Sequence, residues 1–194
     1  MRDNRIAAGE RTYYSGLDDV SSMSPTEKLD WFEERFKKVV SRPLREVRRL
    51  GPSNQAIWDL NLGAVTIICS AIEALGSFFR PGVKDEVAFP DFVTEFMNPK
   101  YREQSQDRGR TYAEILYGQF RCGLAHGFSI EGHEVATRPD EYIVDEGGYV
   151  SIDLWTLFED LERGFETFVS RVRSDAEVQS NFERRFDQIF VNPY

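Results

Sequence analysis

The feature that most constrains this chain is an apolar pattern at helical spacing that runs from Asn54 to about Arg80. Apolar side chains recur there every three or four residues, at Ile57, Leu60, Ala64, Val65, Ile68, Ile72, Leu75 and Phe79. Ile67, Ala71 and Phe78 widen the apolar face beyond the stripe of a surface helix. We therefore predict that this segment forms the central and most buried helix of the protein.

A second helix is predicted to begin after Ser24, where three start signals coincide. The serine suits the N-cap, a proline follows in the first helical position, and Glu27 completes a capping box. The apolar stripe then continues up to Gly51, although Pro43 lacks a backbone donor and predicts a kink or a break. Residues 1–23 are polar and show no sustained periodicity, so we interpret them as a loosely ordered N-terminal arm.

The rest of the chain predicts further helices and one hairpin. A short helix is expected around the aromatic residues of 89–96, and a longer one from Thr111 to His126, where Gly127 would end it. Alternation within 133–152, at 141–144 and 149–152, predicts a small β-hairpin. Two more helices follow from about residue 153. The predicted fold class is all-α: one domain over 24–194, a bundle of four to five core helices with a β-hairpin insertion.

Composition limits the classes of function. The net charge is −9, from 33 acidic and 24 basic residues, which argues against unspecific coating of nucleic acid or of an anionic membrane. The most apolar run, 64–69, is too short to cross a bilayer, and the N-terminus lacks a signal-peptide core. We therefore expect a cytoplasmic protein without membrane contact.

Cysteine and histidine are too few for a four-ligand zinc site. The chain has two of each, and Cys69 and Cys122 lie among apolar neighbours in predicted helices. We interpret both cysteines as free, buried thiols and predict neither a metal nor a cofactor.

The residues best suited to chemistry are Arg121 and His126, five positions apart at the end of a predicted helix. The partial negative charge at a helix C-terminus favours the imidazolium, so His126 would exchange protons near neutral pH. Arg121 carries a permanent planar charge that can bind a phosphate through two hydrogen bonds. Together they offer what metal-independent phosphodiester cleavage requires. The alternative is structural: Arg121 in a surface salt bridge and His126 bonded to helix carbonyls.

The stretch Arg121-Cys122-Gly123-Leu124-Ala125-His126 resembles the motif of the HEPN family. Members of that family carry an arginine, four to six further residues and a histidine at the end of a helix in a small α-helical bundle. The resemblance implies a homodimer in which the two motifs line a shared cleft. In active members it implies RNA cleavage by the ribose 2′-hydroxyl, with Arg121 and His126 in the catalytic roles. Active members often have a polar residue after the arginine, where this chain has Cys122.

Three functions remain open at this point. The first is a metal-independent endoribonuclease of toxin or defence type, with an antitoxin protein as a candidate partner. The second is a catalytically inactive HEPN-like dimer that binds a nucleotide, RNA or a protein. The third, from fold alone, is a helical scaffold whose aromatic residues Phe89, Phe92 and Phe96 face protein partners.

Four further residues are candidates for substrate binding. Glu73 lies in the apolar central helix, one turn after Ser70, and either pairs with Arg121 or faces solvent. Tyr117 either meets a base or phosphate or belongs to the core. Arg45 belongs to a basic run over 35–49 that either contacts RNA phosphates or pairs with acidic residues elsewhere. His133 is interpreted as a loop residue without a role.

Overall fold

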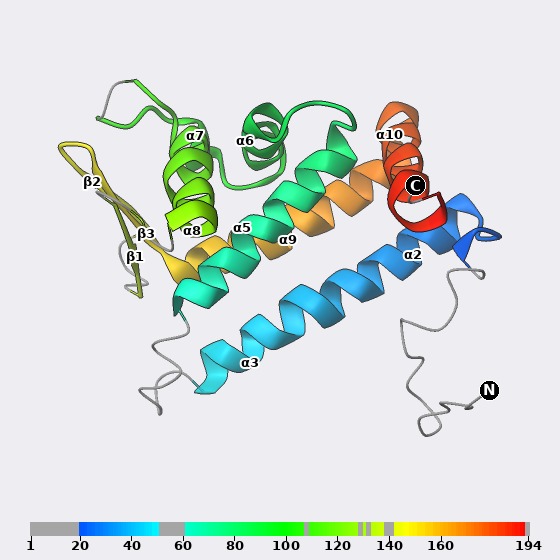
Figure 1. The fold of residues 1–194 in the computed structure, drawn as a ribbon, viewed down its shortest axis with the longest axis horizontal. Coiled ribbons are helices and arrows are strands. Elements are labelled where there is room, and N and C mark those ends of the chain that lie inside the picture. Colours follow the sequence, from blue (N-terminus) through cyan, green and yellow to red (C-terminus); the bar gives the residue numbers. More distant parts are fainter. Residues whose placement is uncertain are drawn as a thin grey trace.

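The computed structural model describes residues 20–50, 61–106, 109–127, 130, 133–137 and 142–192, without the side chains of His126 and Gly127. The described chain is mostly helical, with a small sheet, as predicted (Figure 1). The longer helices are α2 (Pro25–Phe36), α3 (Arg42–Leu50), α5 (Asn61–Phe79), α6 (Asp85–Phe96), α9 (Leu154–Ser174) and α10 (Ala176–Phe186). Between α6 and the sheet lie a 3-10 turn at Pro99–Arg102 and the short helices α7 (Tyr112–Ile115) and α8 (Cys122–Gly127). Three wide π-helical segments, η1 (Lys37–Ser41), η4 (Leu116–Arg121) and η5 (Asp187–Val191), extend or join these helices.

The first helix begins where its capping residues predict. The Ser24 side chain accepts a hydrogen bond from the Glu27 amide, and the Glu27 carboxylate accepts one from the Ser24 amide at 2.8 Å. Pro43 does not break the helix, because the wide turn η1 precedes it and the Arg42 amide bonds to the Lys37 carbonyl, five residues back. A widened turn gives room to the proline ring, and its changed hydrogen-bond pattern accommodates the N–H donor that proline lacks.

Of the predicted N-terminal arm, residues 1–19 lie outside the described residues. Val20 follows them and is buried in the core. After the first helical stretch, which ends with α3 at Leu50, residues 51–60 also lie outside the described residues.

Helix α5 is the central helix, as its periodicity predicts. Nine of its residues are buried, and it packs against α6, α9 and α10. Figure 1 shows α5 and α9 crossing in the middle of the molecule, with α2 and α3 along one side and α6, α7 and α10 along the other. Among the described helices, α5 alone is long and apolar enough to cross a membrane, and half of its apolar window is buried inside the protein. That burial is consistent with the core helix of a soluble protein.

Two glycines allow α6 to lie directly against the backbones of its neighbours. A Cβ on Gly76 of α5 would lie 2.6 Å from the Ala88 carbonyl oxygen. A Cβ on Gly164 of α9 would lie 2.9 Å from Met97 Cγ and 3.2 Å from the Phe96 carbonyl oxygen. A larger residue at Gly76 would have to push the α6 backbone away, whereas one at Gly164 would mainly have to displace the Met97 side chain.

The aromatic residues of α6 are part of the core and not of a surface. Phe89 and Phe92 are 0% exposed and Phe96 is 5% exposed. Phe92 and Phe96 both pack edge-on against Phe168 of α9, at ring-centroid distances of 5.9 and 5.4 Å. The expectation that these three rings face protein partners is therefore wrong: their spacing is that of a helix face, and the face is turned inward.

The predicted hairpin is confirmed, but it belongs to a larger sheet. Strands β2 (Ile143–Glu146) and β3 (Tyr149–Asp153) pair antiparallel across Gly147 and Gly148, whose positive φ angles of 65° and 96° suit a two-residue hairpin turn. Strand β1 (His133–Ala136) pairs parallel with β3, which gives the order β1-β3-β2. The third strand was missed because four residues carry too little alternation to be recognised.

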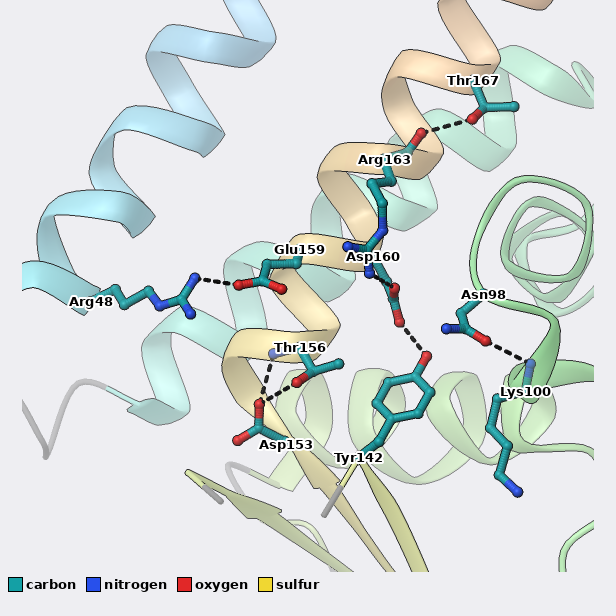
Figure 2. A network of polar contacts seen from close by, with 10 residues as sticks. All are labelled: Arg48, Asn98, Lys100, Tyr142, Asp153, Thr156, Glu159, Asp160, Arg163 and Thr167. Carbon is teal, nitrogen blue, oxygen red and sulfur yellow. Dashed lines mark hydrogen bonds and ion pairs between the residues drawn. The ribbon is translucent and has the colours of Figure 1, made fainter. Parts of the chain in front are cut away.

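A polar network fixes the hairpin to α9 (Figure 2). Asp160 is only 1% exposed, and its carboxylate accepts hydrogen bonds from the Tyr142 hydroxyl and from Arg163. Burial and the bond to Asp160 raise the pKa of Tyr142, which keeps its hydroxyl a donor. Asp153 caps α9 by accepting bonds from the Thr156 amide and hydroxyl, both at 2.7 Å.

Tyr142→Phe is expected to lower the free energy of unfolding by about 2 kcal/mol, because it removes a donor from a buried carboxylate. Urea unfolding followed by circular dichroism measures this. Tyr149→Phe is the matched control, since Tyr149 lies on the same sheet and is 44% exposed. Equal midpoints for the two variants would mean that the network adds nothing to stability.

Candidate functional site

The candidate site lies on the helical stretch α7-η4-α8. The stretch begins with a capping box in which Thr111 Oγ1 accepts from the Glu114 amide and the Glu114 carboxylate accepts from the Thr111 amide. In η4 the helix widens, and the Cys122 amide bonds to the Tyr117 carbonyl, five residues back. Each residue added to a turn rotates the following side chains by about 100°, so this widening decides where Arg121 points.

Arg121 is paired with Glu73 of α5. Its Nε and Nη2 both donate to the carboxylate, the second at 2.7 Å to Oε1. The two side chains are 22% and 25% exposed, and the carboxylate raises the pKa of the guanidinium. The prediction that Glu73 contacts Arg121 is confirmed, and the carboxylate remains partly exposed at the edge of α5. The physical reason is that a carboxylate beside the core needs a partner.

Tyr117 lies against the same guanidinium. Arg121 Cζ is 5.9 Å from the centroid of the Tyr117 ring, which packs on Phe89 at 5.4 Å. Burial, followed by the nearby Cys122 thiol, raises the pKa of Tyr117, so its hydroxyl remains protonated at neutral pH. The packing on Phe89 is what a core position predicts, while contact of Tyr117 with a base or a phosphate stays a prediction.

His126 lies in the last turn of α8, whose last described residue is Gly127. Residues 128 and 129 lie outside the described residues, so the predicted left-handed C-cap at Gly127 stays a prediction. The His126 side chain is outside the described residues. Its position relative to Arg121 therefore stays a prediction.

Ser70 and Arg45 do not join this cluster. Ser70 is exposed on α5, one turn before Glu73. Arg45 pairs with Glu162 of α9 at 2.9 Å, and Figure 1 shows α3 on the other side of α5 from α8.

The basic run of the first helix is largely neutralised by carboxylates. Arg48 pairs with Glu159 at 2.7 Å, and Arg49 with Glu46 at 2.6 Å (Figure 2 draws the first of these). Lys37 pairs with Glu33 and Glu34, and Arg42 pairs with Glu34. This is the pairing with acidic residues that the sequence offered as the alternative to RNA contact.

His133 was expected in a loop, and this is wrong because it begins β1. Its Nδ1 accepts a hydrogen bond from the Val150 amide at 3.1 Å, so the neutral ring carries its proton on Nε2. The ring stacks on Phe120, with centroids 5.9 Å apart, one residue before Arg121. The sheet is therefore docked directly on the site helix, which no local pattern in the sequence indicated.

Both cysteines are free, as predicted, but they differ in exposure. Cys69 is 1% exposed, and burial raises the pKa of its thiol to about 12. Cys122 is half-buried and interacts with Arg121 and Tyr117.

We therefore expect a thiol reagent at pH 8 to modify one cysteine per native chain quickly and the second only after unfolding. The thiolate is the reactive form, and a buried thiol with a raised pKa supplies almost none. Counting modified thiols against time, with Cys122→Ser and Cys69→Ser as references, assigns the fast site. Two equal rates in the native protein would contradict the burial of Cys69.

Comparisons with protein-family models, with curated proteins and with solved structures find no match for this chain. Among the described residues, no group of three or more His, Cys, Asp or Glu side chains is arranged to hold a metal ion.

Proposed function

We propose that this protein is a HEPN-like endoribonuclease that needs no metal and acts as a homodimer of helical bundles. Arg121 binds the scissile phosphate, and His126 is the general acid or base. The ribose 2′-oxygen attacks phosphorus and the bond to the 5′-oxygen breaks. The 2′-hydroxyl loses a proton and the leaving 5′-oxygen gains one, so the products are a 2′,3′-cyclic phosphate and a 5′-hydroxyl.

The observation that carries this proposal is the side of Arg121 that Glu73 leaves available. A guanidinium has five N–H donors on three edges. Glu73 takes the edge formed by Nε and Nη2. The end-on edge, Nη1 with the second hydrogen of Nη2, is not used by Glu73 and has the geometry to bind two phosphate oxygens at once, and the Cys122 thiol also lies against the guanidinium. A planar cation that is already held on one edge loses little freedom when it binds an anion on another.

The exposed face of α5 beside this site supports the proposed dimer. Leu62 and Ile67 are 45% and 40% exposed, and small residues lie between and after them along the same face: Gly63, Thr66, Ser70 and Ala74. A second copy on this face would cover exposed apolar side chains and bring two Arg121–Glu73 pairs near one another.

Ile67→Glu is expected to convert the dimer to monomer, because it would bury an unpaired charge in the interface. Sedimentation of the wild type and the variant at equal concentration measures this. Val39→Glu is the control, since Val39 is 56% exposed and lies on η1 and not on α5. A monomeric wild type, or a dimeric Ile67→Glu variant, would remove α5 as the interface.

The test of activity is cleavage of a mixed-sequence RNA in excess EDTA, followed by analysis of the ends. Cleavage that leaves 2′,3′-cyclic phosphates, and that His126→Ala and Arg121→Ala both abolish, would support the nuclease. Arg171→Ala is the matched control, because Arg171 also pairs with a glutamate but lies on the exposed surface of α9.

A second candidate is a catalytically inactive HEPN-like dimer that binds a nucleotide, RNA or a protein such as an antitoxin. Two features favour it: Glu73 already neutralises Arg121, and Cys122 follows the arginine. RNA retained by the wild type without cleavage, and released by Arg121→Ala, would select this function.

A further inference from the structure

Glu73 is the charged residue of α5 within the described chain, and it lies on the border between the buried and the exposed face. Its neighbours Ile72 and Gly76 are buried, whereas Ser70 and Ala74 are exposed. The carboxylate uses both of its oxygens for Arg121. The edge formed by its two oxygens is therefore occupied by Arg121 and not by a substrate, although the sequence suggested that Glu73 binds one.

The guanidinium of Arg121 is restrained from two directions. Glu73 holds it in its own plane through two hydrogen bonds, and the ring of Tyr117 lies 5.9 Å from Cζ. Tyr117 is in turn packed on Phe89, which is fully buried in α6. An arginine side chain otherwise samples many rotamers, and fixing it before the substrate arrives removes that entropy from the binding step.

We propose that Glu73 is a positioning residue, which holds Arg121 with its end-on edge toward the substrate phosphate and does not touch the substrate itself. This inference rests on the proposed function. This role needs two acceptor oxygens at a fixed distance from the Arg121 backbone, because a planar carboxylate accepts both parallel N–H donors of the side-on edge. The wide turn η4 and the position of Glu73 on α5 together set that distance.

The positioning role predicts opposite effects on turnover and on binding. Without Glu73 the guanidinium is free to reorient, so turnover falls, since misplacing a reacting group by about 1 Å costs about a hundredfold. Binding does not fall with it, because the site gains positive charge and two additional donors for phosphate. A residue that only stabilised the fold would lower both quantities and the melting temperature together.

The experiment compares Glu73→Gln with the wild type. Glutamine has the same shape, but its amide group turns a donor toward one of the two guanidinium donors. We expect kcat for RNA cleavage to fall about tenfold to a hundredfold, while the Kd for an RNA with a 2′-deoxy sugar at the cleavage site stays equal or becomes lower. Glu95→Gln is the matched control, because Glu95 pairs with Arg171 away from the site. An unchanged kcat, or a loss of kcat and binding in parallel with a lower melting temperature, would overturn the proposal.

A measurement that does not depend on cleavage separates this inference from the proposed function. The Arg121 Nε–H is held in a charge-assisted bond, so its ¹H–¹⁵N signal should persist at neutral pH and be assigned by its loss in Arg121→Lys. We expect Glu73→Gln to broaden that signal and to bind inorganic pyrophosphate at least as tightly as the wild type. A wild type that does not cleave RNA would end the nuclease proposal, while a signal that is unchanged in Glu73→Gln would end the positioning proposal.

Discussion

Arg121→Ala is expected to lower RNA turnover by about a hundredfold or more, by analogy with the loss of one donor to a transition-state oxyanion. In the proposed reaction the phosphorane carries more negative charge than the phosphate of the bound RNA, and Arg121 would offer it two donors on one edge. The loss should therefore fall mainly on kcat and only in part on KM. Single-turnover cleavage at saturating protein measures it directly.

The same substitution leaves the Glu73 carboxylate without its partner, which by itself lowers stability. A double variant, Arg121→Ala with Glu73→Gln, removes the charge and restores the melting temperature but leaves turnover low. Turnover that returned with stability would show that Arg121 acts on the fold and not on the phosphate. Arg121→Lys provides a second comparison, because it keeps the charge and loses the planar donor pair.

Gly76→Ala is expected to destabilise the protein by about 3 kcal/mol, the upper range for overpacking a well-packed core. The added Cβ would lie 2.6 Å from the Ala88 carbonyl oxygen and 2.9 Å from its carbonyl carbon. Both atoms are backbone, so no side chain can rotate away and the whole of α6 has to shift. Chemical unfolding measures the change in free energy.

Gly63→Ala is the control, and its expected sign is opposite. Gly63 lies in the same helix, and nothing lies within 4 Å of a Cβ added there. Alanine favours a helix interior over glycine by about 1 kcal/mol, so this variant should be more stable than the wild type. Two destabilised variants would mean that α5 tolerates no added methyl group anywhere, and two stabilised variants would mean that α6 does not lie against Gly76.

The parts of the fold that the sequence predicted well are those that neighbouring residues decide. Ser24 with Glu27, and Thr111 with Glu114, form their capping boxes within three residues. Gly147 and Gly148 form their turn on their own. The apolar stripe of the central helix is long enough to be recognised without any tertiary contact.

Distant pairings were harder to predict, because nothing in the local sequence names the partner. Arg45 meets Glu162, 117 residues away, and so takes part in a surface ion pair and not in the site. Strand β1 depends on β3, with His133 opposite Val150. The wide turn η4 depends on how the helix packs, and it decides the direction of Arg121.

The contact of Glu73 with Arg121 spans 48 residues and was nevertheless predicted. The argument was energetic and not local: a carboxylate in an apolar helix needs a cation. Such an argument identifies a pair without giving its geometry. It could not show that the carboxylate takes the side-on edge of the guanidinium, which is the detail on which the proposed chemistry depends.

In the described sheet the order β1-β3-β2 leaves two outer strands, and each carries an acidic residue: Glu134 on β1 and Glu146 on β2. An outer strand is a template to which another chain can add, so open edges invite aggregation. Two copies that met edge to edge would bring carboxylates together, and their repulsion opposes such pairing. The acidic charge on the outer strands therefore disfavours the addition of a second sheet to this one.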